Sequence, residues 1–150
     1  MSKKISVAID GPSGAGKSTL SRRAAGRFHF LYVDTGAIYR TVGLAAFRCG
    51  IAASDGERVT AMLPELRIEL RHGEDGLQHM FLGGEDVSAE IRLPEISLYA
   101  SAVSAIPAVR AYLMDMQRNL AKEHNVIMDG RDIGTVVLPD ADLKIFLTAS

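Results

Sequence analysis

The amino-terminal part of the chain alternates short apolar runs with amphipathic segments. Residues 5–9 form a β-branched apolar run that ends at a glycine-rich turn, which is the pattern of a buried parallel strand. In the next segment Leu20, Ala24 and Phe28 recur every four residues, and arginines occupy other directions. This spacing predicts an amphipathic helix over 17–28 that packs on the sheet through those three side chains.

A second strand and helix are predicted to follow. Residues 31–33 are a brief apolar run, and 35–49 have the periodicity of a helix. Thr35 is expected to cap this helix and Gly50 to end it. Its apolar face is predicted to consist of Ile38, Val42 and Ala45.

The middle of the chain departs from this strand and helix rhythm. A short helix is predicted over 54–63, and apolar residues then alternate with polar ones at 66–70 and again at 80–82. Residues 73–76 between the two alternating segments supply turn chemistry, so a β-hairpin is expected. Two interpretations remain open: an inserted substrate-binding subdomain, or a simple hairpin at the edge of a sheet.

The carboxyl-terminal part returns to helices and strands. Helices are predicted over 94–105 and 107–123, each with proline at or near its start, and strands over 126–128 and 143–147. The second helix has an apolar stripe assigned to the core, made by Val109, Leu113, Met116 and Leu120. Together these elements predict an α/β fold with a mainly parallel sheet covered by helices on both faces. Ligands of such sheets bind beyond the carboxyl ends of the strands.

Composition narrows the class of protein. With 150 residues and 47% hydrophobic content, the chain has material for one sizeable core, so a single domain over 1–150 is expected. The balance of 17 basic and 18 acidic residues gives no net attraction to nucleic acid or to a membrane, so any phosphate binding has to be local. The lone Cys49 fits a reducing cytoplasm, and neither a signal peptide nor a run of about 18 apolar residues is found.

The segment Gly11–Ser18 matches the phosphate-loop pattern G-x-x-x-x-G-K-[ST] and lies between a predicted strand and a predicted helix, as that pattern requires. Its backbone N–H groups and the amino end of the helix favour a nucleotide's phosphates, and Lys17 is expected to reach the β and γ oxygens. Ser18 is a candidate ligand of Mg²⁺, and Thr19 is a candidate hydrogen-bond donor to the α-phosphate. The residues assigned to ATP binding are Gly11, Pro12, Ser13, Gly14, Ala15, Gly16, Lys17, Ser18 and Thr19.

Three further charged positions lie at or beyond the ends of predicted strands, and the residues alone leave their roles open. Asp34 precedes a helix and either orients a phosphate acceptor or caps that helix, and Arg40 is either an acceptor-phosphate ligand or a solvated helix residue. Asp129 either holds a magnesium-bound water or belongs to a turn, since Asp-Gly is common turn chemistry.

The motifs GPSGAGKST, DTGAIYR, GEDVSAEIR and DGRDIGTVV, in this order over residues 11–137, resemble those of the bacterial cytidylate kinases. The third and fourth together distinguish that family from adenylate and shikimate kinases. The resemblance implies a P-loop kinase that uses ATP and Mg²⁺ to phosphorylate CMP or dCMP, giving CDP or dCDP and ADP. It also places an acceptor-binding insertion at about 54–92.

Carried over position by position, the resemblance implies three sets of site residues. The catalytic residues implied are Lys17, Arg40 and Arg131. The acceptor-binding residues implied are Thr35, Tyr39, Arg40, Ser101, Arg110, Arg131 and Asp132. The magnesium site implied consists of Ser18 and Asp129.

Three of these positions match the residues by which the family reads cytosine, and the chemistry suits them. A carboxylate or hydroxyl from Asp132 or Ser101 would accept from the N4 amine, and the Arg110 guanidinium would donate to N3 and O2. Uracil inverts this pattern, so discrimination of roughly 10⁴ against UMP is expected. Without the family, Ser101 and Arg110 are typical of an ordinary helix serine and a surface arginine.

The family continues beyond the equivalent of Ser150 into an arginine-bearing lid, ribose-binding residues and a final strand and helix. We therefore expect this chain to be incomplete at its carboxyl end. If 150 residues is the mature length, the lid is missing, and we expect binding to survive while turnover largely fails. Two alternatives remain: a kinase for UMP, AMP or shikimate, and a nucleotide-binding module with little catalysis. The expected partners are ATP and a pyrimidine nucleoside monophosphate, without nucleic acid or membrane, and the protein is expected to be a cytoplasmic monomer.

Overall fold

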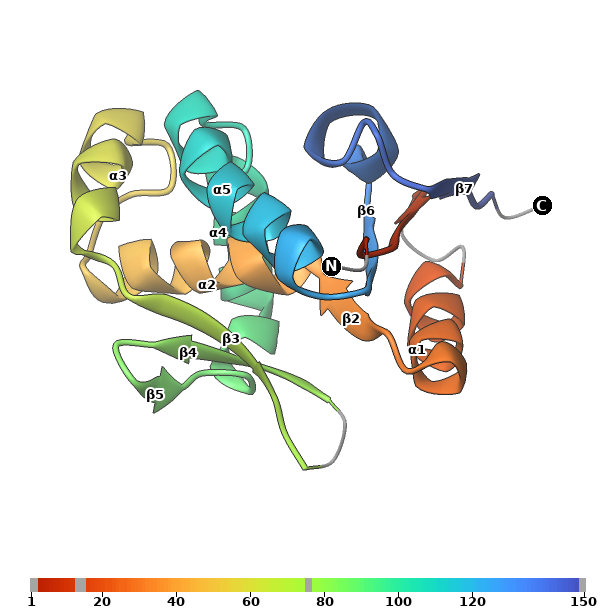
Figure 1. Ribbon diagram of the computed structural model, residues 1–150. Helices are drawn as coiled ribbons and strands as arrows, with labels where there is room; N and C mark the ends of the chain where they lie inside the picture. Colours follow the sequence, from red (N-terminus) through yellow and green to blue (C-terminus); the bar gives the residue numbers. More distant parts are fainter. Residues whose placement is uncertain (1–2, 13–15, 75–76, 149–150) are drawn as a thin grey trace. The chain divides into compact units, whose positions relative to one another are not determined.

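The computed structural model describes residues 3–12, 16–74 and 77–148. The chain divides into two compact units: a first unit formed by 1–35 and 114–150, and a second unit formed by 36–113. Figure 1 shows that the first unit is assembled from both ends of the chain, with the amino-terminal and carboxyl-terminal strands side by side. The predicted insertion at 54–92 lies inside the second unit.

The first unit is built on a four-stranded sheet in the order β2-β6-β1-β7, with every pair parallel. The strands are β1 (Ser6–Asp10), β2 (Leu31–Asp34), β6 (Val126–Gly130) and β7 (Leu143–Phe146). Asp129 of β6 is in register with Ile9 on one side and with Asp34 on the other. The parallel α/β fold predicted from the sequence is therefore confirmed, and the carboxyl ends of three strands meet at one edge.

Helix α1 (Lys17–Phe28) has the predicted bounds but packs through a different face. Ser21 and Ala25 are buried, whereas Leu20 is 41% and Phe28 61% exposed, so the predicted packing face was wrong for these two residues. The third predicted residue, Ala24, is partly buried and does pack against the core. Small residues let the helix lie close to the strands, and Ala25 packs with Ile9 and Ile127. Burial of Ser21 is tolerated because its hydroxyl donates to the carbonyl oxygen of Lys17 at 2.7 Å.

A turn of π-helix, η3 (Ile133–Val137), was not predicted from the sequence. It follows β6 after two residues and contacts β1. Strand β6 also runs to Gly130 rather than ending at Met128, and β1 includes Asp10.

The second unit combines helices with a small antiparallel sheet. Its elements are α2 (Thr35–Arg48, whose first residue belongs to the first unit), α3 (Gly56–Met62), η1 (Leu63–Glu65), β3 (Ile68–His72), β4 (Gln78–Leu82), β5 (Glu85–Asp86), η2 (Glu90–Arg92) and α4 (Pro94–Val103). The predicted hairpin is confirmed, with Leu70 opposite Met80, and β5 adds a third strand. The predicted face of α2 is buried, and Gly43 lets that helix approach α4, because an added Cβ would lie 3.0 Å from the Ala100 nitrogen.

Helix α5 (Pro107–Glu123) has the predicted bounds and runs from the second unit into the first. Val109 and Leu113 are fully buried as predicted, whereas Met116 and Leu120 are only half-buried and the polar Gln117 is 1% exposed. Within the described residues, no single helix is long and apolar enough to cross a membrane; α4 and α5 reach that length and composition only as a pair bent by 98°.

Candidate nucleotide-binding site

The glycine-rich segment joins β1 to α1 in the first unit, as predicted. Gly11 is buried with φ +147°, and a side chain there would collide with the backbone carbonyl of Leu147. Gly16 has φ +81° at the start of α1, in the left-handed region that favours glycine. Pro12 is exposed. Three of the predicted ATP-binding residues lie outside the described residues: Ser13, Gly14 and Ala15.

Lys17 connects this segment to the end of β6. Its ammonium group donates to the carbonyl oxygens of Gly11 at 2.8 Å and Gly130 at 3.0 Å. These bonds hold the cationic group at the carboxyl edge of the sheet, beside the first turn of α1, where Ser18 and Thr19 are exposed. That first turn, all of whose residues are described, carries no acidic side chain, so the positive end of the helix dipole stays available to an anion.

Asp129 is a buried carboxylate at the same edge. The hydroxyl of Tyr32 donates to its Oδ2 at 2.8 Å, and the side chain is in register with Asp34 on β2. Burial raises the pKa of Asp129 to about 6, and the negative charge of Asp34 also raises it, whereas the bond from Tyr32, the charge of Lys17 and a polar contact with Ser21 oppose the shift. The negative charge of the ionised Asp129 carboxylate is therefore only partly balanced by its neighbours, which favours binding of a cation beside it.

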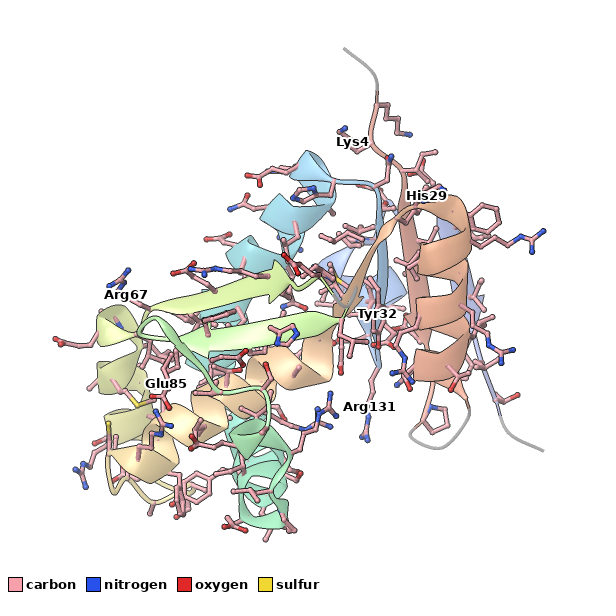
Figure 2. The ribbon with its side chains drawn as sticks, turned by 90° about the horizontal axis from the view of Figure 1, so that it is seen from below. Lys4, His29, Tyr32, Arg67, Glu85 and Arg131 are labelled. Carbon is pink, nitrogen blue, oxygen red and sulfur yellow. The ribbon has the colours of Figure 1, made fainter. Side chains whose placement is uncertain are left out.

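Tyr32 was not singled out from the sequence. Burial, followed by the negative charges of Asp34 and Asp129, raises its pKa far above the ordinary value, so the hydroxyl remains a proton donor to Asp129. Figure 2 labels this half-buried residue on β2. A polar tyrosine inside an otherwise apolar strand run was the available signal, because a buried phenol needs a hydrogen-bond partner.

The donor set fits Mg²⁺ better than a softer metal. Ser18 and Asp129 offer a hydroxyl and a carboxylate, which are the hard oxygen ligands that Mg²⁺ prefers. Among the described residues, no group of three or more His, Cys, Asp and Glu side chains could hold a metal by itself. A site with so few protein ligands suits Mg²⁺, which keeps several waters and binds substrate phosphates.

The predicted acceptor-binding residues divide between the two units. In the first unit, Thr35 is buried and its hydroxyl donates to the Asp129 carbonyl oxygen at 2.8 Å, which ties the start of α2 to β6. Arg131 is exposed, and Figure 2 shows its side chain extending away from the carboxyl end of β6. Asp132 is half-buried immediately before η3. The first unit thus gathers Lys17, Arg131 and Asp132 around the ends of the central strands.

The remaining acceptor residues lie in the second unit. Tyr39 and Arg40 are half-buried on α2, Ser101 is exposed on α4, and Arg110 is half-buried on α5. Their assignment to the acceptor stays a prediction.

Asp10 is a further buried carboxylate that sequence reasoning treated only as the end of a strand. It is 7% exposed, and its two oxygens accept the backbone N–H groups of Ile133 at 2.7 Å and Gly134 at 2.8 Å. Its position directly before the glycine loop gave no indication of partners more than a hundred residues away.

Comparison with known proteins agrees with this geometry. The family model described as cytidylate kinase matches residues 7–150. A cytidylate kinase from Caldicellulosiruptor bescii is 53% identical over 148 residues, covering 99% of this chain and 65% of that protein. A cytidylate kinase from Syntrophotalea carbinolica is 49% identical, and the match covers 100% of this chain and 63% of that protein. A cytidylate kinase from Symbiobacterium thermophilum is 47% identical, and the match covers 99% of this chain and 66% of that protein.

The chain thus spans just under two thirds of the length of these curated relatives. The match covers all four sequence motifs, the parallel sheet and the edge at which Lys17 and Asp129 lie. On these grounds the chain belongs to the cytidylate kinase family.

Proposed function

We propose that this chain carries the donor and acceptor sites of a kinase that transfers the γ-phosphoryl group of ATP to CMP or dCMP, giving ADP and CDP or dCDP. The observation that carries the proposal is the junction of β1 and α1. There Lys17 bridges the carbonyls of Gly11 and Gly130, in a chain matched by the cytidylate kinase family over residues 7–150.

The donor phosphates bind the glycine loop and the amino end of α1. Successive backbone N–H groups surround the β-phosphate, and Lys17 exchanges its carbonyl contacts for charged phosphate oxygens, which are stronger acceptors. The exposed Thr19 hydroxyl donates to the α-phosphate.

Ser18 and Asp129 would hold Mg²⁺, which would supply positive charge against the negative charge of the nucleotide's phosphates. Tyr32 keeps the Asp129 carboxylate oriented by donating to Oδ2. Thr35 fixes the backbone of the same residue by donating to its carbonyl oxygen.

Acceptor binding combines phosphate ligands with base readers. Arg40 and Arg131 hold the acceptor phosphate through bidentate guanidinium contacts, with Thr35 and Tyr39 beside them. Asp132 and Ser101 accept from the cytosine N4 amine, and Arg110 donates to N3 and O2. UMP would leave these polar groups without matching partners.

Phosphoryl transfer then needs alignment and charge neutralisation rather than a covalent intermediate or a general base. The acceptor phosphate oxygen attacks the γ-phosphorus in line, while the bond from that phosphorus to the β–γ bridging oxygen breaks and ADP leaves. Lys17, Arg40 and Arg131 surround the transferring group and offset the charge that it carries in the transition state.

The test is an ADP-release assay with ATP and Mg²⁺ in which CMP, dCMP, UMP, AMP and shikimate are compared as acceptors. We expect CMP and dCMP to be preferred by up to roughly 10⁴ over UMP. Asp132→Ala should reduce this preference about tenfold or more, whereas the exposed control Asp140→Ala should not change it.

Equal or better turnover with UMP, AMP or shikimate would reject the assignment of the acceptor. If calorimetry detected binding of both ATP and CMP but no ADP was released even at high protein concentration, the chain would be a nucleotide-binding module with little catalysis.

A further inference from the structure

The π-helical turn η3 is held at both ends by charged side chains from other parts of the first unit. At its start, Asp10 accepts the Ile133 N–H through Oδ1 at 2.7 Å and the Gly134 N–H through Oδ2 at 2.8 Å. Both bonds are buried, and each involves an ionisable acceptor, so they are stronger than ordinary peptide hydrogen bonds.

At the other end, Arg118 of α5 binds two carbonyl groups of the same turn. Its Nε donates to the Val137 oxygen and its Nη2 to the Val136 oxygen, both at 3.0 Å. Asp10 therefore satisfies N–H groups at the start of η3, and Arg118 satisfies carbonyls at its end, each in a bidentate arrangement.

The hydrogen bonds with Asp10 and Arg118 supplement the small number of backbone bonds that a single π-turn can form by itself. The bonds that close this wide turn include Val136 N–H to the Asp132 carbonyl at 2.9 Å, Val137 N–H to the same carbonyl at 3.3 Å and Leu138 N–H to the Ile133 carbonyl at 2.6 Å. One isolated helical turn fixes several backbone dihedrals for each bond gained and is not stable alone.

The residues directly before η3 are Arg131 and Asp132, which lie between two anchored positions. The Gly130 carbonyl oxygen accepts from Lys17, and a Cβ on Gly130 would lie 2.8 Å from the Ile133 side chain, so that side chain packs closely on the Gly130 backbone. Ile133 is itself buried and bound to Asp10. A two-residue segment with both ends fixed has little conformational freedom. The geometry of η3 therefore sets the backbone positions from which the Arg131 and Asp132 side chains extend.

We propose that Asp10 and Arg118 are positioning residues for the acceptor: they hold η3 so that Arg131 and Asp132 meet the phosphate and base of a cytosine nucleotide. The inference rests on the proposed function. It adds two residues that touch neither nucleotide and that act through the backbone of η3.

Arg118 gives the sharper test because it is on α5, whereas Asp10 directly precedes the glycine loop in the chain. Arg118→Met keeps the aliphatic stem and removes both bonds to η3. The matched control is Arg27→Met, an exposed arginine in the last turn of α1. The full chain is titrated calorimetrically with CMP and, separately, with ATP and Mg²⁺, and each variant's fold is checked by circular dichroism.

We expect Arg118→Met to weaken CMP binding about tenfold or more and to change ATP binding less than about twofold, because small displacements of binding groups are costly. Arg118 bonds to the end of η3, whereas Lys17 bonds to the carbonyls of Gly11 and Gly130. Arg27→Met should leave both affinities unchanged. In an Arg131→Ala background, Arg118→Met should lose most of its effect, because coupled residues are not additive.

Asp10→Asn tests the other end of the turn, since one of the two backbone N–H groups would then face an amide donor. Hydrogen exchange at Ile133 and Gly134 should accelerate, and CMP binding should weaken. Asp142→Asn is the control: Asp142 also accepts a backbone N–H of β1, from Ser6, but at the opposite end of that strand.

The outcomes separate the two levels of the hypothesis. Wild-type binding of CMP together with unchanged CMP affinity in folded Arg118→Met would overturn the positioning role and leave the proposed function intact. The positioning role would also be overturned if Arg118→Met weakened CMP and ATP binding equally, or if its effect on CMP affinity added fully to that of Arg131→Ala. Either result would indicate that Arg118 has a general structural role. Failure of the wild-type chain to bind CMP would overturn the proposed function itself. If Asp10→Asn does not fold, Arg118→Met decides the question.

Discussion

Two glycines of the phosphate loop allow a direct comparison of backbone strain with steric exclusion. Both Gly11 and Gly16 have positive φ, +147° and +81°, so alanine at either position is strained. At Gly16, among the described residues, no atom lies within 4 Å of the position an added Cβ would take. Gly16→Ala should therefore cost only the conformational penalty, about 1 kcal/mol of the free energy of unfolding.

Gly11→Ala faces an additional obstacle. Its Cβ would run into the carbonyl oxygen of Leu147 and would lie 3.2 Å from the carbonyl carbon and 3.4 Å from the nitrogen of that residue. These are backbone atoms that cannot rotate away, and the Leu147 N–H is bonded to the Asp10 carbonyl at 2.8 Å. Relief would require breaking the pairing of β7 with β1, so we expect a total cost of about 3 kcal/mol or more.

Urea unfolding followed by far-ultraviolet circular dichroism measures both variants. Gly11→Ala should be at least about 2 kcal/mol less stable than Gly16→Ala, which follows from the two estimates above. An equal or smaller loss for Gly11→Ala would refute the close packing of the loop against the end of β7.

Two further predictions concern charged groups. The pKa of Asp129 is raised to about 6 in the folded chain, so between about pH 4 and pH 6 the folded state keeps a proton that the unfolded state has already lost. The free energy of unfolding in metal-free buffer should therefore fall by on the order of 3 kcal/mol as pH rises through this range. Asp129→Asn should remove this pH dependence. Urea unfolding at several pH values checks it, and identical profiles for the two proteins would contradict it. Arg48 is bonded to Glu85 at 3.1 Å and to Glu90 at 2.8 Å on the surface of the second unit, so Arg48→Met should cost less than about 1 kcal/mol in thermal unfolding; a larger loss would show that this network is more than an exposed ion pair.

Much of the fold could be predicted because local sequence signals agree with the tertiary structure. Helix α5 begins at Pro107, where proline lacks only an N–H that would be unpaired anyway, and its apolar stripe continues through Leu113. The β3-β4 hairpin follows from alternation around a glycine-containing turn. These signals lie within a few residues of one another, so the sequence displays them directly.

The failures depend on contacts between distant residues or on bonds that hydrophobicity does not describe. Ser21 is buried because its hydroxyl is satisfied by Lys17, whereas Phe28 is large and apolar but exposed. The turn η3 is β-branched and apolar in sequence, which is typical of a strand. Asp10 and Arg118 stabilise it from remote positions.

The candidate site shows the same division. The placement of the glycine-rich segment and Lys17 between β1 and α1 was predictable because the motif and its flanking strand and helix are local in sequence. The bond between Tyr32 and Asp129 joins strands separated by most of the chain, and only the fold brings them together. The acceptor residues of the second unit were assigned by resemblance, and that assignment stays a prediction.

Calorimetric titration of ATP with Mg²⁺ into the wild-type chain and into Lys17→Met tests the central claim most directly, that the junction of β1 and α1 grips a nucleotide's phosphates. We predict saturable binding by the wild type and a loss of affinity of about tenfold or more in the variant, because a charge-assisted contact to phosphate is removed. Equal affinity in the two folded proteins, or no binding by the wild type, would contradict the claim.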